Sequence, residues 1–229
     1  MKIFIDSADI DEIKQAYAWG VCEGITTNPS LLRKAVEKRI NRGEALDIKT
    51  YIQHILKVAK GTRVSLEVTE TNASGMIEQG KRLYALFNPV AHNVYIKIPI
   101  NPALKNEDST HFDGIIAIKA LAKMKIPVNC TLIFTPEQAL LAARAGAKIV
   151  SPFAGRIDDY LRVFQGFKFD KAEYYPASGR MGKDGIMNDN GVVSGIDLVR
   201  QCVQIVKNYN LKTEVLAASL RNPRQVREA

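Results

Sequence analysis

The sequence predicts an α/β protein in which helices cover a parallel β-sheet. Short runs rich in β-branched residues alternate with stretches of helical apolar period along the 229 residues, and sustained alternation of this kind is typical of parallel sheets. Two architectures satisfy the pattern, a doubly wound open sheet and a (β/α)8 barrel. No GxGxxG motif follows the first predicted strand, so a dinucleotide-binding open sheet is not indicated.

Each predicted strand is a short run of β-branched, aliphatic or aromatic residues with polar or turn-forming residues at its ends. In chain order these strands are Ile3–Asp6, Gly24–Thr27, Val64–Val68, Val94–Ile98, Val128–Phe134, Ile149–Ser151 and Glu214–Ser219. Their spacing leaves room for a helix after most of them, as a parallel connection requires.

The predicted helices have apolar residues at intervals of three or four positions. They are Ala8–Trp19, Gly75–Phe87, Gly114–Lys123, Pro136–Ala145 and Ile196–Tyr209. Their apolar positions include Ile10 and Ile13, Met76 and Leu83, Ile115 and Ile118, Leu140 and Leu141, and Val199 and Val203. The basic run Lys38–Arg42 is interpreted as a solvated loop between helices.

Length and composition favour one domain over residues 1–229, or at most two small ones, because 46% of the residues are hydrophobic and can form one sizeable core. The alternation of strands and helices stops between residues 166 and 195. That segment holds several aromatic residues and glycines, and it is predicted to be either a lid over a site or a solvated insertion.

The composition also excludes several classes of protein. No run of about 18 apolar residues occurs, so no membrane partner is expected. The net charge is +8, which favours anionic ligands, but the basic residues are mixed with acids and do not form the stripe typical of nucleic-acid binding. The cysteines Cys22, Cys130 and Cys202 are far apart, and three separated thiols suggest a reducing, cytoplasmic location.

Polar side chains recur on one face of successive predicted strands. Side chains alternate between the two faces of a strand, so the apolar residues of Val94–Ile98 share one face and Lys97 lies on the other. The residues assigned by the same rule to this second face include Asp6, Ser65, Glu67, Asn129, Thr131, Ser151, Phe153 and Ser219. Burying a charged side chain costs free energy unless the charge is paired. The set therefore indicates a functional site rather than a structural core.

The residue types suit carbon–carbon bond chemistry. Lys97 lies between two isoleucines in a central strand, where loss of water would favour a neutral amine able to attack a ketone. Glu67 and Asp6 could transfer protons, and Asn129 with Thr131 could hold a water molecule or a substrate hydroxyl. The three histidines are not in the spacing of metal ligands, so neither a metal nor another cofactor is expected.

At these residues the sequence resembles the transaldolase family, including its small members related to fructose-6-phosphate aldolase. The matching words are Phe4-Ile-Asp6-Ser-Ala, Gly24-Ile-Thr-Thr-Asn28-Pro-Ser-Leu, Ser65-Leu-Glu67-Val, Ile96-Lys97-Ile-Pro, Asn129-Cys-Thr131-Leu-Ile-Phe, Ser151-Pro-Phe153-Ala-Gly-Arg156-Ile-Asp-Asp and Ala217-Ala-Ser219-Leu-Arg221-Asn. They follow the family order and extend from the first residues of the chain to the last.

The resemblance implies a role for each matching residue. Lys97 would form the Schiff base with the ketose donor, Asp6 would be the acid/base, and Glu67 with Thr131 would position the catalytic water. The residues implied to line the site are Asn28, Asn129, Ser151 and Phe153, and those implied to hold the substrate phosphate are Arg156, Ser219 and Arg221. A guanidinium group suits a phosphate, so phosphorylated sugars are the expected partners, and a homo-oligomer is expected.

Two positions separate activities within the family. Related fructose-6-phosphate aldolases carry Gln in place of Glu67 and Tyr in place of Phe153, so the pair present here resembles the transaldolase arrangement. The predicted reaction transfers a dihydroxyacetone unit from sedoheptulose 7-phosphate or fructose 6-phosphate to an aldose phosphate, in the non-oxidative pentose phosphate pathway. The alternatives are a lyase of the aldolase type and an inactive relative that binds sugar phosphates.

The sequence departs from the family at two places. The segment 166–195 is longer than in the smallest members, and its ending, Asn188–Ser194, resembles longer transaldolases. The family's eighth strand and following helices have no counterpart after Ala229, so the implied fold is a (β/α)8 barrel from which the eighth unit is missing. A shortened sequence, closure by a partner chain and an inactive protein all stay open, and the first is favoured.

Overall fold

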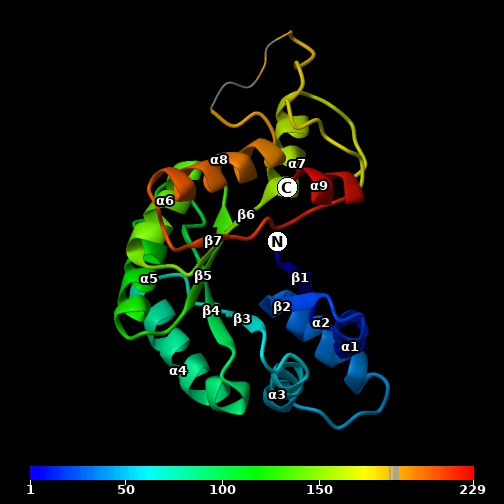
Figure 1. Cartoon of the computed structure of the whole chain (residues 1–229), viewed down its shortest axis with the longest axis vertical. Helices are drawn as coiled ribbons and strands as arrows, with labels where there is room; N and C mark the ends of the chain where they lie inside the picture. Colours follow the sequence, from blue (N-terminus) through cyan, green and yellow to red (C-terminus); the bar gives the residue numbers. More distant parts are fainter. Residues whose placement is uncertain (186, 188–190) are drawn as a thin grey trace. The chain divides into compact units, whose positions relative to one another are not determined.

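The computed structural model of the chain describes residues 1–185, 187 and 191–229, and strands alternate with helices along it (Figure 1). The strands are β1 (Ile3–Asp6), β2 (Cys22–Thr26), β3 (Arg63–Glu67), β4 (Val94–Pro99), β5 (Val128–Ile133), β6 (Ile149–Pro152) and β7 (Glu214–Val215). The helices are α1 (Ile10–Ala18), α2 (Pro29–Ile40), α3 (Ile48–Val58), α4 (Ala73–Ala91), α5 (Asp113–Lys123), α6 (Pro136–Ala145), α7 (Ala154–Phe164), α8 (Gly195–Asn208) and α9 (Pro223–Glu228).

The strands form one sheet whose spatial order is the chain order, β1 to β7. The pairs β1–β2, β2–β3, β3–β4 and β6–β7 are parallel. A doubly wound sheet reverses its strand order at a switch point, whereas sequential parallel strands joined by helices are the topology of a β/α barrel. The predicted fold class is confirmed, and the described residues supply seven of the eight strands of a TIM-type barrel.

The chain divides into two compact units. The first comprises Met1–Ile98 and Ala103–Asn129. Its core is made of fully buried aliphatic side chains from strands and helices, among them Ile13, Ile25, Ile55 and Leu66. Within this unit α4 packs against both α3 and α5, so the apolar faces of these helices and of β3 and β4 are removed from water together.

The second unit comprises Pro99–Pro102 and Cys130–Ala229. Here α8 packs on α6, α7 and β7 (Figure 1). The predicted lid or insertion at 166–195 lies in this unit, and its described residues form turns and one isolated bridge between Met181 and Met187. Residues 186 and 188–190 lie outside the described residues, and the last three of these begin the predicted family-like ending Asn188–Ser194.

Helices α2, α3 and α7 were missing from the prediction. Lys38–Arg42 was wrongly interpreted as a loop, because Lys38 and Arg39 form the last turn of α2, where basic side chains interact favourably with the helix dipole. The signal for α2 was the pair Asn28-Pro29, an N-cap followed by proline in the first turn. The pair Asn222-Pro223 begins α9 in the same way.

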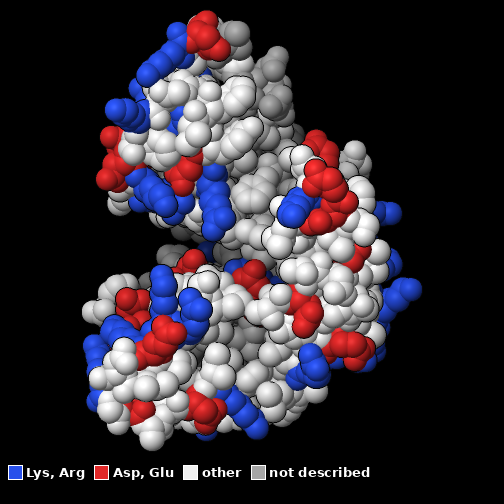
Figure 2. All heavy atoms as spheres, turned by 180° about the vertical axis from the view of Figure 1, so that it is seen from behind, with Lys and Arg blue, Asp and Glu red and all other residues white. Residues whose placement is uncertain are grey.

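No helix in the described part of the chain is both long and apolar enough to cross a membrane. On the face shown in Figure 2, lysine and arginine side chains are interspersed with aspartate and glutamate. This mixed pattern agrees with the even distribution of charge along the sequence.

Candidate active site

The register of β3 and β4 places Glu67 directly beside Lys97. Lys97 is only 5% exposed, and its Nζ lies 3.2 Å from Glu67 Oε2. The same Nζ donates a hydrogen bond of 3.2 Å to the Thr27 carbonyl oxygen. Lys97 is therefore buried, as the sequence predicts, but its neighbours include a carboxylate and a carbonyl oxygen rather than apolar groups alone.

Residues of the neighbouring strands lie on the same face. Asn129 Nδ2 donates to Ser65 Oγ over 3.0 Å, and both residues are fully buried. Thr27 Oγ1 donates to the Ser65 carbonyl oxygen, so the end of β2 is tied to β3 beside the lysine. The structure thus brings Glu67, Lys97 and Asn129 together on one face of the sheet. Glu67 is the last residue of β3, and the carboxyl ends of parallel strands are where α/β enzymes place their chemistry.

Asp6 ends β1 and pairs in register with Thr26 of β2. Thr26 Oγ1 donates to Asp6 Oδ1 over 2.8 Å, which orients the exposed carboxyl group. A carboxylate oriented in this way can accept a proton from a ligand.

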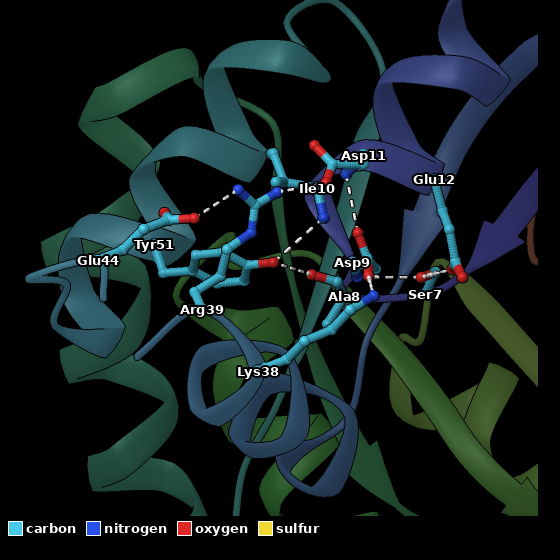
Figure 3. A network of polar contacts seen from close by, with 10 residues as sticks. All are labelled: Ser7, Ala8, Asp9, Ile10, Asp11, Glu12, Lys38, Arg39, Glu44 and Tyr51. Carbon is cyan, nitrogen blue, oxygen red and sulfur yellow. Dashed lines mark hydrogen bonds and ion pairs between the residues drawn. The ribbon is translucent and has the colours of Figure 1, made fainter. Parts of the chain in front are cut away.

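The turn after Asp6 is held by the network in Figure 3. Tyr51 of α3 donates to the Ala8 carbonyl oxygen over 2.7 Å and accepts from the Ile10 N–H, which lies 3.1 Å away. Because Tyr51 is 2% exposed, it forms a buried support for the β1–α1 turn. The position of Asp6 at the end of β1 therefore depends on α3, which is distant in sequence.

Ion pairs complete the same network (Figure 3). Lys38 Nζ lies 2.6 Å from Asp9 Oδ2, and Arg39 links Asp11 to Glu44 at 2.7 and 2.9 Å. Burial alone would raise the pKa of Asp9, but hydrogen bonds from Lys38 and the Asp11 N–H outweigh it, and the pKa is lower than usual. Two basic residues of α2 thus anchor the start of α1.

Asn28 is the N-cap of α2. Its Oδ1 accepts a hydrogen bond of 2.9 Å from the Leu31 N–H. This contact uses the side-chain oxygen for helix capping, and the amide nitrogen is the atom that remains for a ligand. Sequence reasoning identified this residue only as a lining residue.

Thr131 and Ser151 are buried polar residues of β5 and β6. Among the described residues, Thr131 Oγ1 is a buried oxygen without a hydrogen-bond partner. Buried hydroxyl groups are normally satisfied by protein or by water, so this oxygen is suited to binding a water molecule or a ligand hydroxyl.

Phe153 stands at the N-cap position of α7 without a side-chain cap. Its ring contacts that of Phe134 edge to face, with 6.0 Å between centroids, and the Arg156 guanidinium lies 5.8 Å from its centroid. Arg156 is exposed. The contact with the Phe153 ring places the Arg156 cation at the first turn of α7.

Ser219 and Arg221 lie close to the same helix end. Gly155 N–H donates to the Ser219 carbonyl oxygen over 3.1 Å, and Ser219 has a left-handed backbone with φ of 61°. A methyl group on Gly155 would lie 2.1 Å from that oxygen, so only glycine permits this approach. Arg221 Nη2 donates to Asp159 Oδ2 over 2.8 Å, which fixes the guanidinium.

Sequence reasoning missed the residues that orient these groups. Thr26 holds Asp6, Thr27 contacts Lys97, and Asp159 holds Arg221. Each of these residues lies in a segment that resembles the transaldolase family. The sequence therefore contained them, but no role was assigned to them. No group of His, Cys, Asp or Glu in the described residues is arranged to hold a metal ion.

The comparison with known families decides the relationship. The transaldolase/fructose-6-phosphate aldolase family matches residues 3–229. The chain belongs to this family. Relatives named "Probable transaldolase" are 40% identical in Nitrosopumilus maritimus over 100% of this chain and 79% of the relative, and 40% identical in Desulfatibacillum aliphaticivorans over 100% and 81%. Another, from Thermoplasma acidophilum, is 39% identical over 97% of this chain and 77% of the relative.

Among solved structures, a lactate oxidase of Pediococcus acidilactici resembles the chain with a TM-score of 0.53 and 11% identity. The match covers 100% of this chain, which spans 58% of the oxidase. At this identity the likeness concerns the fold alone.

Proposed function

We propose that the chain is a class I transaldolase, which transfers a dihydroxyacetone unit from a ketose phosphate to an aldose phosphate through a Schiff base on Lys97. The observation that carries the proposal is the buried pair of Lys97 and Glu67, with 3.2 Å between Nζ and Oε2. An amine must lose a proton before it attacks a ketone, and a carboxylate at this distance can take it. Membership of the family and the names of the relatives support the same assignment.

In the proposed reaction the neutral amine of Lys97 attacks the C2 carbonyl of the ketose. The resulting carbinolamine hydroxyl takes a proton and leaves as water, which gives the protonated Schiff base. Asp6 takes the proton of the C4 hydroxyl, the C3–C4 bond breaks, and its electron pair forms an enamine while the aldose departs. The enamine carbon adds to the acceptor aldehyde, and hydrolysis of the new Schiff base releases the product.

Glu67 and Thr131 are assigned to the water that leaves and returns. The buried Thr131 Oγ1, which has no partner among the described residues, supports this role. Asn28, Asn129 and Ser151 are assigned to the sugar hydroxyls, since amides and hydroxyls both donate and accept hydrogen bonds.

Arg156, Ser219 and Arg221 are assigned to the substrate phosphate. Support comes from the two guanidinium groups, which offer charge and N–H donors in one part of the second unit. Among the described residues, Arg221 Nε is buried and has no hydrogen-bond partner, so this donor is available to a phosphate oxygen.

The transferase is distinguished from a lyase by its acceptor requirement. The protein is supplied with fructose 6-phosphate with and without erythrose 4-phosphate, and we expect sedoheptulose 7-phosphate only when the acceptor is present. Release of glyceraldehyde 3-phosphate at the same rate without an acceptor would instead support an aldolase of the fructose-6-phosphate type.

Borohydride reduction tests the Schiff base itself. Fructose 6-phosphate with borohydride should leave a reduced adduct on the peptide that contains Lys97, and Lys97→Met should abolish it. Lys81→Met, at an exposed pair on α4, is the control. Absence of an adduct in the folded wild-type protein would favour the inactive sugar-phosphate-binding relative.

We further propose that the reaction belongs to the non-oxidative pentose phosphate pathway and occurs in the cytoplasm. The described cysteines are all free, which suits a reducing compartment. Burial raises the pKa of Cys202 to about 12 and that of Cys130 well above its usual value, so these thiols are protected from oxidation by lack of thiolate. Fractionation of cells that express the native gene, followed by activity assays, tests the location.

A homo-oligomer is proposed as well. Helix α7 exposes Tyr160, Val163 and Phe164 by 58–68%, and the rings of Tyr160 and Phe164 stack. An apolar helix face of this kind suits contact with a second copy. Light scattering after gel filtration should give more than one chain per particle. Phe164→Lys should lower that number and the control Tyr209→Lys should not.

A further inference from the structure

Asp158 is a buried acid with no assigned role in the proposed chemistry. It is 1% exposed and lies on α7, two residues after Arg156. Its Oδ1 accepts from the Gly195 N–H at 2.7 Å, and its Oδ2 accepts from Gln225 Nε2 at 2.5 Å. One carboxylate therefore connects α7, α8 and α9.

Gln225 passes this contact on to Arg221. Its Oε1 accepts from the Arg221 backbone N–H at 2.6 Å, and the residue is 1% exposed. The side-chain amide thus donates at one end and accepts at the other, which leaves it a single usable orientation. The backbone of Arg221 is held by Gln225, and its guanidinium is held by Asp159.

We propose that Asp158 and Gln225 are positioning residues, which set the place of Arg221 for an anionic phosphate group without touching that group. The inference rests on the proposed function, because it takes Arg221 as a phosphate ligand. Arg221 lies at the end of the segment between β7 and α9, directly before the N-cap Asn222. It is outside any helix or strand, so the buried contact with Gln225 supplies a constraint on its backbone.

The two donors that face position 158 explain why an aspartate is found there. Gly195 N–H and Gln225 Nε2 are both donors, so position 158 must accept twice, and only an ionised carboxylate does so without bringing a donor of its own. Burial raises the pKa of Asp158 to about 6, although the Gly195 N–H, the charge of Arg162 and Gln225 lower it. Asp159 and Tyr175 are the other titratable groups that interact with it.

The test uses the donors and acceptors of this contact. Asp158→Asn puts an N–H2 group opposite Gln225 Nε2. If the Gln225 amide turns to accept from it, its own N–H2 group faces the Arg221 N–H. Adding Gln225→Glu supplies two acceptors at position 225, so the double variant restores every hydrogen bond while the negative charge moves from position 158 to position 225.

Binding of inorganic phosphate at pH 7.5 is measured by calorimetry, together with borohydride trapping of unphosphorylated dihydroxyacetone on Lys97. We expect Asp158→Asn to weaken phosphate binding by roughly tenfold, with trapping unchanged, and the double variant to recover most of the affinity. KM for fructose 6-phosphate should follow phosphate affinity while kcat changes little. Asp170→Asn, at an exposed turn whose cap an amide preserves, is the matched control.

The outcomes separate the inference from the proposed function. If borohydride traps no dihydroxyacetone on Lys97 of the wild type, the proposed Schiff base is contradicted. Phosphate binding by the variants would still test whether Asp158 and Gln225 position Arg221. Wild-type affinity in folded Asp158→Asn, failure of the double variant to recover, or no phosphate binding by the wild type would each overturn the inference. If Asp158→Asn does not fold, Gln225→Asn replaces it, because the shorter amide cannot reach both partners and should cause the same loss.

Discussion

At the scale of single residues, Lys97 and Glu67 combine burial with an ion pair. A lone buried ammonium would be costly, but a carboxylate at 3.2 Å and the Thr27 carbonyl oxygen compensate for the lost water. The same carboxylate is close enough to exchange a proton with the amine. The features that make the lysine tolerable in the core are therefore the ones that suit it for Schiff-base formation.

Replacing Glu67 tests its assignment. Related aldolases carry Gln at this position, so Glu67→Gln should still form the adduct on Lys97. We expect the ratio of acceptor-dependent transfer to acceptor-free cleavage of fructose 6-phosphate to fall by about tenfold or more, because an uncharged amide exchanges protons poorly. Glu70→Gln, three residues further along, is the control. An unchanged ratio in Glu67→Gln would contradict the role.

The close approach at Gly155 gives a prediction for stability. In Gly155→Ala the added methyl would lie 2.1 Å from the Ser219 carbonyl oxygen, and a backbone atom cannot move away as a flexible side chain can. We expect a loss of about 3 kcal/mol in the free energy of unfolding, measured in urea. Gly75→Ala is the control, since its neighbour is the side chain of Glu70 and a small change should result.

At the scale of elements, the predicted strands agree with the structure within one or two residues except for the last. Strand β7 ends at Val215 rather than Ser219. An isolated parallel bridge pairs Ala218 with Phe153, and the left-handed backbone of Ser219 follows it. Helix α2 was missed because its charged residues hide a short buried stripe of Leu32, Ala35 and Val36. Periodicity is a weak signal when so few positions face the core.

Two variants of Asn28 distinguish helix capping from substrate binding at the start of α2. Asn28→Ala removes the cap to Leu31 and should cost about 1 kcal/mol in unfolding free energy. Asn28→Asp keeps a side-chain acceptor and should retain most of that stability, while it loses the amide donor. If KM for the ketose rises in both variants, the amide binds substrate. A rise confined to Asn28→Ala would show that capping alone matters.

The junction of α7, α8 and α9 at Asp158 predicts a dependence on pH. Its pKa is about 6 in the folded protein against an ordinary value of 3.8, so the folded state holds the proton more tightly between these values. This residue therefore lowers stability as the pH rises from about 4 to 6, by about 3 kcal/mol at most. The unfolding free energy of wild type minus that of Asp158→Asn should fall over this window. A constant difference would contradict the shift.

The candidate site could be predicted from sequence as a set of residues but not as a set of contacts. Alternation along strands places Glu67, Lys97 and Asn129 on one face. The contact of Gln225 with Asp158 joins residues 67 positions apart, and that of Tyr51 with Ala8 joins residues 43 positions apart. Such pairs depend on how helices pack, which neither spacing nor residue type specifies.

At the scale of the whole molecule, the net charge of +8 should assist the capture of the phosphorylated substrates proposed above. The basic groups are interspersed with acids (Figure 2), so the effect is a general attraction rather than a local stripe. We expect kcat/KM for fructose 6-phosphate to fall several-fold as salt rises from about 0.01 to about 0.3 M. Trapping of unphosphorylated dihydroxyacetone should change little, and an equal decline in both would contradict the explanation.

The left-handed backbone of Ser219 has a consequence for how this protein could change over generations. Glycine would adopt φ of 61° without strain, so Ser219→Gly is an accessible route to a more stable chain, by about 1 kcal/mol. The same step removes the hydroxyl assigned to the phosphate. Selection for heat resistance alone should therefore favour glycine at this position, whereas selection for growth on the substrate should restore serine.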